Sequence, residues 1–132
     1  EFGMAASNRK RILIVEDNEM FQRILKKRME TRGYNVFIAV DGLEGLTMAQ
    51  KEKPDLVLLD LLLPKIDGYK VCQLIKRDHR LRGIPVAIFT SRDGEKDADL
   101  AKEAGADAFI VKSTHPEIMM GVIGSLLDQR EA

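Results

Sequence analysis

The sequence predicts a single α/β domain in which helices cover both faces of a doubly wound, five-stranded parallel sheet. Short apolar runs typical of buried strands alternate five times with segments whose apolar residues recur at helical spacing. Only a few residues connect one segment to the next, and such an alternation requires right-handed crossovers and parallel strands. The length of 132 residues is that of one ordinary domain.

Composition excludes several classes of protein. The single cysteine, Cys72, rules out a disulfide framework and a cysteine-based zinc site. Lys plus Arg and Asp plus Glu both number 21, and this balance argues against a dedicated binder of nucleic acid or anionic membrane. No apolar run approaches the roughly 20 residues of a membrane span, and no secretory signal is visible, so we expect a cytoplasmic protein. We expect an expression scar at 1–4, a frayed lead-in at 5–8 and the domain at 9–130.

A strand and a helix open the predicted domain. Residues 11–15 read RILIV, a short apolar run bounded by charge. Asn18 can cap the helix that follows, and Gly33 comes after its last turn. The apolar positions along this helix are Met20, Phe21, Ile24, Leu25 and Met29.

The second and third strands enclose a second helix. Residues 34–40 are strand-like, and Asp41 can cap a helix that ends before Pro54. Two glycines in the first turn of this helix weaken it. Residues 55–59 are almost wholly apolar, as in a central strand covered on both faces. The residues expected to face inward along the helix are Leu43, Leu46 and Ala49.

The remaining elements continue the same alternation. Pro116 opens the last helix at the first helical position, where a missing N–H costs least. Gly105 ends the helix before it. The expected elements are, in order, a loop at 60–67, a helix at 68–78, a strand at 85–89, a helix at 93–104, a strand at 108–111 and the last helix from 116.

The polar residues that carry chemistry stand where the predicted strands end. In an open parallel sheet, ligands bind beyond the carboxyl ends of the strands. We expect strands 11–15 and 55–59 to be neighbours, so that three carboxylates converge and need a cation between them. Oxygen ligands with room for water suit Mg²⁺. The strand-end residues are Glu16 and Asp17 after the first strand, Asp60 after the third, Thr90 and Ser91 after the fourth, and Lys112 after the fifth.

This set of residues is suited to phosphoryl transfer. The Asp60 carboxylate can attack phosphorus and form an acyl phosphate. Phosphoryl transfer needs positioning and charge neutralisation, which Mg²⁺ and Lys112 supply, while Thr90 offers a hydroxyl donor. Neither a P-loop nor a dinucleotide-binding glycine pattern is present. A flavin phosphate fits poorly, because Glu16 and Asp17 would repel it.

With these residues in place, the chain resembles the receiver domain of two-component response regulators over residues 9–130. Pro64 and Gly68 stand four and eight residues beyond Asp60 in the run DLLLPKIDG, as the family pattern expects. Thr90 falls at the position of the family's switch hydroxyl, Lys112 at its invariant lysine and Phe109 at its switch aromatic. The resemblance implies a flavodoxin-like (βα)5 fold with strand order 2-1-3-4-5.

The resemblance also implies a role for each site residue. Asp60 would accept a phosphoryl group from a histidine kinase or a histidine phosphotransfer protein, in a phosphoacceptor domain rather than an enzyme. Asp17, Asp60 and the backbone carbonyl of Leu62 would ligate Mg²⁺, with Glu16 acting mostly through water. Thr90 and the backbone N–H of Ser91 would contact the phosphoryl oxygens, and Lys112 would pair with Asp60 or its phosphate.

Phosphorylation would then act as a switch. Thr90 would move inward and Phe109 would fill the space it leaves, which changes the face formed by residues 93–104, 108–111 and the last helix. The partner reading this face would be a downstream protein or an output domain outside this sequence. The resemblance implies neither direct nucleic-acid binding nor membrane binding by this domain. Helix 1 of such domains also docks kinases, so the basic run 26–28 is either a solvated helix face or part of an interface.

Two positions depart from the family pattern: the residue after Lys112, and Ser91, which stands where a small apolar residue is commoner. The family usually has Lys-Pro with a cis bond where this chain has Lys112-Ser113. A cis bond before a residue other than proline costs about 3 kcal/mol, so we expect a trans bond. Leu62 cannot activate water, which predicts self-dephosphorylation on a scale of minutes or longer.

Alternative interpretations remain open from the residues alone. A phosphatase with an aspartyl nucleophile would need a second Asp where this chain has Leu62. A pseudo-receiver that binds proteins without taking phosphate has the Lys112-Ser113 pair as its only support. Taken singly, Asp60 could form a turn and Phe109 could be a core residue. We expect structural roles for the remaining candidate ligands, His79, His115 and Cys72.

Overall fold

The computed structural model of this protein describes residues 9–91 and 94–131, with side chains as far as 129. Its elements follow the predicted alternation of strands and helices. Their bounds are β1 (Arg11–Val15), α2 (Glu19–Thr31), β2 (Asn35–Ala39), α3 (Gly42–Glu52), β3 (Leu56–Leu59), α4 (Gly68–Arg77), β4 (Val86–Thr90), α5 (Glu95–Glu103), β5 (Ala108–Val111) and α6 (Pro116–Glu131). The expected scar, the lead-in and the predicted helix start at Asp93 lie outside the described residues.

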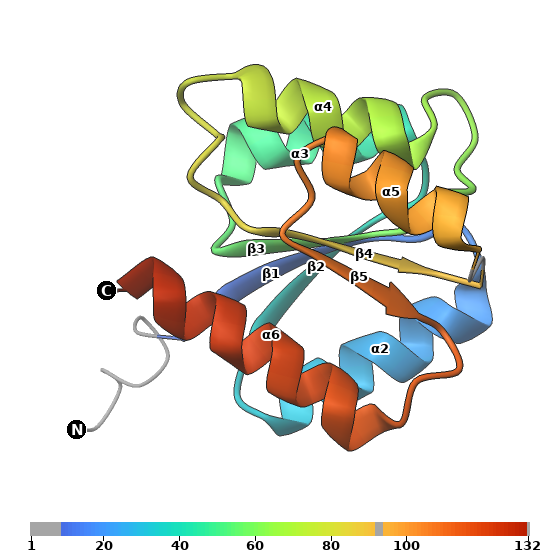
Figure 1. The fold of residues 1–132 in the computed structure, drawn as a ribbon. Helices are drawn as coiled ribbons and strands as arrows, with labels where there is room; N and C mark the ends of the chain where they lie inside the picture. Colours follow the sequence, from blue (N-terminus) through green and yellow to red (C-terminus); the bar gives the residue numbers. More distant parts are fainter. Residues whose placement is uncertain (1–8, 92–93, 132) are drawn as a thin grey trace.

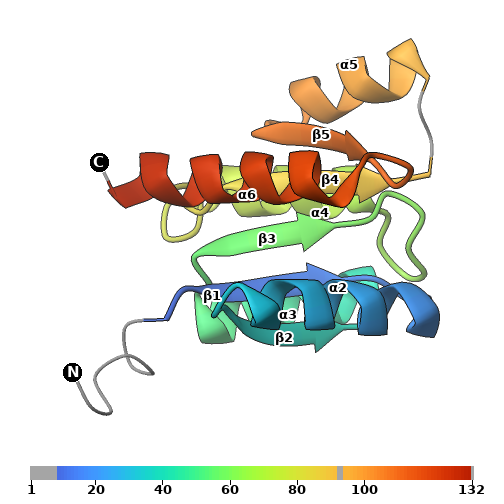
Figure 2. The same cartoon turned by 90° about the horizontal axis from the view of Figure 1, so that it is seen from below.

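The sheet forms the middle of three layers. Its five parallel strands run in the order β2-β1-β3-β4-β5, which confirms the predicted fold class and topology. Helices α3, α4 and α5 cover one face, and α2 and α6 cover the other (Figure 1). The view from the side of α2 and α6 separates the five strands in this order (Figure 2).

Strand register brings the carboxyl ends of the central strands level with one another. Val15 of β1 pairs with Leu59 of β3, so the residues that follow them, Glu16 and Asp60, leave the sheet side by side. Thr90 of β4 pairs with Val111 of β5. Because every strand pairing is parallel, all five carboxyl ends lie at one edge of the sheet, and four of them carry the predicted site residues.

The strands bury both faces of the sheet, as expected for parallel strands between helical layers. In β3, Val57 and Leu59 pack into the core under α3, α4 and α5, whereas Leu56 and Leu58 pack into the core against α2 and α6. All residues of β3 are buried. The predicted central strand is confirmed.

The predicted caps are also present. Asn18 accepts a hydrogen bond from the N–H of Phe21 at 3.0 Å, and Asp41 accepts one from the N–H of Glu44 at 2.8 Å. Gly33 and Gly105 adopt left-handed φ angles of 88° and 94° after their helices, a conformation that glycine adopts without strain.

Leu43, which was predicted to face inward, is exposed instead, and so are two of the apolar positions named for α2. Met20 and Ile24 of α2 are 52% and 41% exposed, and Leu43 of α3 is 50% exposed. Helix α2 buries only Leu25 and Met29 completely, because its apolar stripe is wider than the strip that touches the sheet. Leu43 lies about 100° around the helix axis from its neighbour Gly42, which is buried, so the two residues face different directions.

Helix α3 packs through its small residues, which is why Leu43 faces outward. Gly42, Gly45 and Ala49 are its buried positions. A Cβ atom added at Gly45 would lie 2.8 Å from Cγ1 of Val15, and one added at Gly42 would overlap the main-chain oxygen of Ile66. The glycines lower the intrinsic stability of the helix, but they allow it to lie close to β1 and to the loop after β3.

Candidate functional site

Three carboxylates meet at the carboxyl edge of the sheet. Glu16, Asp17 and Asp60 each offer one oxygen, and these oxygens all lie within 4.8 Å of one another. Glu16 and Asp60 are buried, whereas Asp17 is exposed. The structure thus brings together the carboxylates that strand order predicted to converge.

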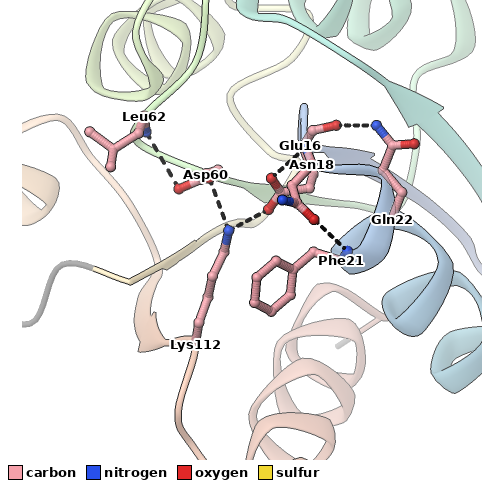
Figure 3. A network of polar contacts seen from close by, with 7 residues as sticks. All are labelled: Glu16, Asn18, Phe21, Gln22, Asp60, Leu62 and Lys112. Carbon is pink, nitrogen blue, oxygen red and sulfur yellow. Dashed lines mark hydrogen bonds and ion pairs between the residues drawn. The ribbon is translucent and has the colours of Figure 1, made fainter.

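Main-chain hydrogen bonds fix the two buried acids. The N–H of Glu16 donates to the oxygen of Ala39 at 3.0 Å, and the N–H of Asp60 donates to the oxygen of Val15 at 3.1 Å. Both residues therefore extend the strand ladder by one step. The side chain of Gln22, in the first turn of α2, donates to the main-chain oxygen of Glu16 at 2.6 Å (Figure 3).

Lys112 reaches these acids from the end of β5. Its Nζ lies 2.6 Å from Oε1 of Glu16 and 3.1 Å from Oδ2 of Asp60 (Figure 3). The N–H of Lys112 donates to the main-chain oxygen of Thr90 at 2.7 Å, which ties the base of this side chain to β4. The side chain is only 10% exposed, so a nearly buried ammonium lies between two buried carboxylates.

Burial and ion pairing act against each other on both sides of this contact. Burial raises the pKa of Glu16, and the contact with Lys112 only partly opposes this. Burial lowers the pKa of Lys112, but the contacts with Glu16 and Asp60 outweigh it, so the pKa is raised overall. The charged forms of Glu16 and Lys112 thus stabilise each other. The carboxylates of Glu16 and Asp60 together carry more negative charge than the single Lys112 ammonium can balance.

The residues of this site fit a magnesium ion. All of the donors are carboxylate oxygens, the ligands that Mg²⁺ prefers, and the exposed Asp17 leaves room for the waters that Mg²⁺ keeps. The three carboxylates exceed the charge of Lys112, so a cation would relieve their mutual repulsion.

The other predicted site residues lie around this cluster. Thr90 is the last residue of β4 and is fully buried, and Ser91 after it is exposed. Phe109 of β5 is half-buried and packs against the core under α3, α4 and α5. Leu62 is 51% exposed, and its N–H points to Oδ1 of Asp60 at 3.4 Å (Figure 3).

The bond between Lys112 and Ser113 is trans, as expected, because none of the peptide bonds in the described part of the chain is cis. Among the same residues, no helix combines the length and the apolar character that crossing a membrane requires. His115 accepts a hydrogen bond from the N–H of Glu117 at 3.1 Å. Cys72 is fully buried in α4, in keeping with its predicted structural role.

One contact of the site was missed from the sequence. The sequence pattern identified Phe21 only as an apolar position of α2, but its ring centroid lies 4.2 Å from Nζ of Lys112. Phe21 stands in the first turn of the helix, four residues after Asp17. This position is the sequence signal from which its contact with the site could have been predicted. Phe21 therefore belongs to the site as well as to the core.

An acidic cluster and a lysine lie at the carboxyl edge of a five-stranded parallel sheet, the edge at which open α/β domains bind their ligands. Comparison with known proteins identifies the family within this class. Residues 12–123 match the family described as the response regulator receiver domain, and the chain belongs to it. It is a receiver domain of the two-component response regulators, a family of phosphoacceptor domains that bind Mg²⁺ through acidic residues.

Individual relatives agree with this assignment. The chain is 40% identical over 124 residues to the probable transcriptional regulator ycf27 of Cyanophora paradoxa, covering 94% of this chain and 51% of that protein. It is 38% identical over 117 residues to the DNA-binding dual master transcriptional regulator RpaA of Synechocystis, covering 89% of this chain and 48% of that protein. The chain thus spans about half the length of these curated relatives.

A solved structure shows the same fold. The CheY-like response regulator receiver domain protein from Methanospirillum hungatei superposes with a TM-score of 0.87 at 31% identity, over 94% of this chain and 98% of that chain. None of the comparisons supports the pseudo-receiver alternative.

Proposed function

We propose that this receiver domain accepts a phosphoryl group on Asp60, with Mg²⁺ held by Asp17, Asp60 and the main-chain carbonyl of Leu62, and with Glu16 acting mostly through water. The observation that carries the proposal is the position of Asp60: its Oδ2 lies 3.1 Å from the Lys112 ammonium, within the cluster of carboxylate oxygens. When bound, Mg²⁺ would supply charge neutralisation at the phosphoryl oxygens.

Each residue of the site has its own role in the phosphoryl transfer. The Asp60 carboxylate forms a bond to phosphorus while the phosphorus–nitrogen bond of the donor histidine breaks and leaves its electron pair on that nitrogen. Lys112 stays protonated and pairs with the charge that develops on the phosphoryl group. The Thr90 hydroxyl and the backbone N–H of Ser91 would donate to phosphoryl oxygens. The donor is a histidine kinase or a histidine phosphotransfer protein.

We propose that Thr90 and Phe109 transmit the change to the face formed by α5, β5 and α6. Thr90 ends β4 and Phe109 lies on the neighbouring β5, an arrangement that would let the two residues link the site to this face. Two-state rearrangements of this kind follow from a local change of charge. The receiver unit spans 9–130, and its output is a downstream protein or a domain outside this sequence, because the curated relatives are twice as long and are named transcriptional regulators.

Phosphorylation of Asp60 can be tested with acetyl phosphate and Mg²⁺, followed by intact mass. We expect the wild-type chain to gain one phosphoryl group, about 80 Da. The Asp60→Asn variant should gain none, whereas Asp99→Asn, the same chemical change on an exposed helix position, should react like the wild type. A wild type without adduct, or an undiminished adduct on Asp60→Asn, would contradict the proposal.

The same sample reports the lifetime of the phosphoryl group. Leu62, two residues after Asp60, is exposed, and its side chain has no group that could activate water. After the acetyl phosphate is removed, the adduct should therefore persist for minutes or longer. Loss of the adduct within seconds would show that another group activates water.

A further inference from the structure

The Lys112 ammonium lies between two carboxylates and an aromatic ring. The ring centroid of Phe21 is 4.2 Å from Nζ of Lys112, and that of Phe89 is 5.9 Å away. The two rings meet edge to face, with centroids 6.4 Å apart and an interplanar angle of 79°. Figure 3 shows the ring of Phe21 beside the end of the lysine side chain, across from Asp60.

A ring in this position attracts a cation. The face of an aromatic ring carries partial negative charge, and an ammonium within about 6 Å of its centroid is held by it, more strongly where water is excluded. The Lys112 side chain is 10% exposed, so water screens this attraction little. The ammonium is thus within ion-pair distance of Glu16 and Asp60 and lies over the ring of Phe21.

The turn that places the ring also places Glu16. The N–H of Phe21 donates to Oδ1 of Asn18 at 3.0 Å, which anchors the ring in the first turn of α2. The N–H of Asn18 in turn donates to Oε2 of Glu16 at 3.0 Å. One helix cap therefore sets the positions of two of the three groups that hold the ammonium.

We propose that Phe21 is a positioning residue for phosphorylation, because its ring face holds the Lys112 ammonium against Asp60 where the charge of the incoming phosphoryl group develops. This role rests on the proposed function of Asp60. The competing explanation is that Phe21 only fills space between α2 and Phe89. If Phe21 positions Lys112, the rate of phosphorylation depends on the electron density of the ring face. If Phe21 only fills space, the rate depends on the volume of the ring.

The contact itself can be observed without any phosphorylation. In the metal-free wild type, ring currents from Phe21 should shift the ε-methylene protons of Lys112 upfield of those of exposed lysines in NMR spectra. The Phe21→Leu variant should lose most of this shift while it keeps the spectrum of a folded domain. An unshifted Lys112 resonance in the wild type would overturn the proposal.

The role in the reaction is tested by the rate of phosphorylation with acetyl phosphate at saturating Mg²⁺. Phe21→Leu should slow the reaction about tenfold, equivalent to about 1.4 kcal/mol of barrier. Phe21→Tyr keeps a ring of similar electron density and should stay near the wild-type rate. Fluorinated phenylalanine at position 21 keeps the volume but withdraws charge from the ring face, so the rate should fall with increasing fluorination.

Phe37 provides a matched control, since its ring lies 4.8 Å from the Arg11 guanidinium, outside the carboxylate cluster. The same replacements at Phe37 should leave the rate unchanged. Equal rates for all fluorinated forms at position 21 would overturn the role of Phe21 alone. A wild type that takes no phosphoryl group would overturn the proposed function and this role with it, even where the shifted Lys112 resonance is observed.

Discussion

At the scale of single residues, Asp17 differs from the other two carboxylates of the site because it is exposed. Glu16 and Asp60 are buried and already share the charge of Lys112. An exposed carboxylate is open to solvent, the side from which hydrated ions arrive. We therefore expect Asp17 to be the first carboxylate of the site to contact an incoming metal ion.

Replacing Asp17 should accordingly weaken metal binding. We expect Asp17→Asn to raise the dissociation constant for Mg²⁺ at least about tenfold, because a neutral amide oxygen replaces an anionic ligand. Isothermal titration calorimetry on the unphosphorylated protein measures this directly. Asp99→Asn removes the same charge at an exposed position outside the cluster and should bind Mg²⁺ like the wild type. Equal affinities for both variants would rule out Asp17 as a ligand.

The sequence predicted the acids and the lysine of this site but not the ring beside them. Glu16, Asp60 and Lys112 each follow a strand directly, so the topology of a parallel sheet is enough to bring them to one edge. The contact between Phe21 and Lys112 depends instead on the rotation of α2 about its axis and on the path of a long side chain. Apolar spacing along a helix determines neither of these.

At the scale of elements, the first residue of α4 supports the loop that carries Asp60. The N–H of Gly68 donates to the main-chain oxygen of Leu61 at 3.0 Å. A Cβ atom at Gly68 would lie 2.7 Å from Cα of Leu61 and would overlap the main-chain oxygen of Asp60. Helix and loop are thus in direct backbone contact, which only glycine allows.

This contact predicts opposite effects for two glycine replacements. Gly68→Ala should lower the free energy of unfolding by about 1–3 kcal/mol, because the added methyl group must displace main chain. It should also slow phosphorylation, since Asp60 moves with the loop. Gly121→Ala in α6 meets nothing within 4 Å and should raise the free energy of unfolding by about 0.5–1 kcal/mol. Urea unfolding measures both changes, and a Gly68→Ala variant as stable as the wild type would contradict the close approach.

The elements themselves were predictable, but some of their faces were not. The five strands and five helices follow from the alternation of apolar runs with helical spacing. The inward orientation predicted for Leu43 was wrong, because the buried face of α3 joins the predicted Ala49 to two glycines, Gly42 and Gly45, that give no hydrophobic signal. Where glycines make the close contact, apolar periodicity points to the wrong side of a helix.

At the scale of the whole molecule, Cys72 reports on the opening of the fold. It is the only cysteine of the chain, and its Sγ donates to the main-chain oxygen of Ala104 at 3.5 Å, between α4 and the end of α5. Burial raises the pKa of its thiol to about 11, so near neutral pH the folded protein offers almost no thiolate. Alkylation of Cys72 should therefore require an opening that exposes the layer under α4 and α5.

If that opening is the cooperative unfolding of the domain, a ligand at the carboxyl edge of the sheet should suppress it. Mg²⁺ at about 100 times its dissociation constant stabilises the folded state by about 2.7 kcal/mol, so alkylation by iodoacetamide should slow about 100-fold. Asp17→Asn at the same Mg²⁺ concentration should show a smaller effect, and urea-unfolded protein should show none. A labelling rate that does not depend on Mg²⁺ would mean that α4 and α5 separate locally while the site stays intact, and the domain would then not open as one unit.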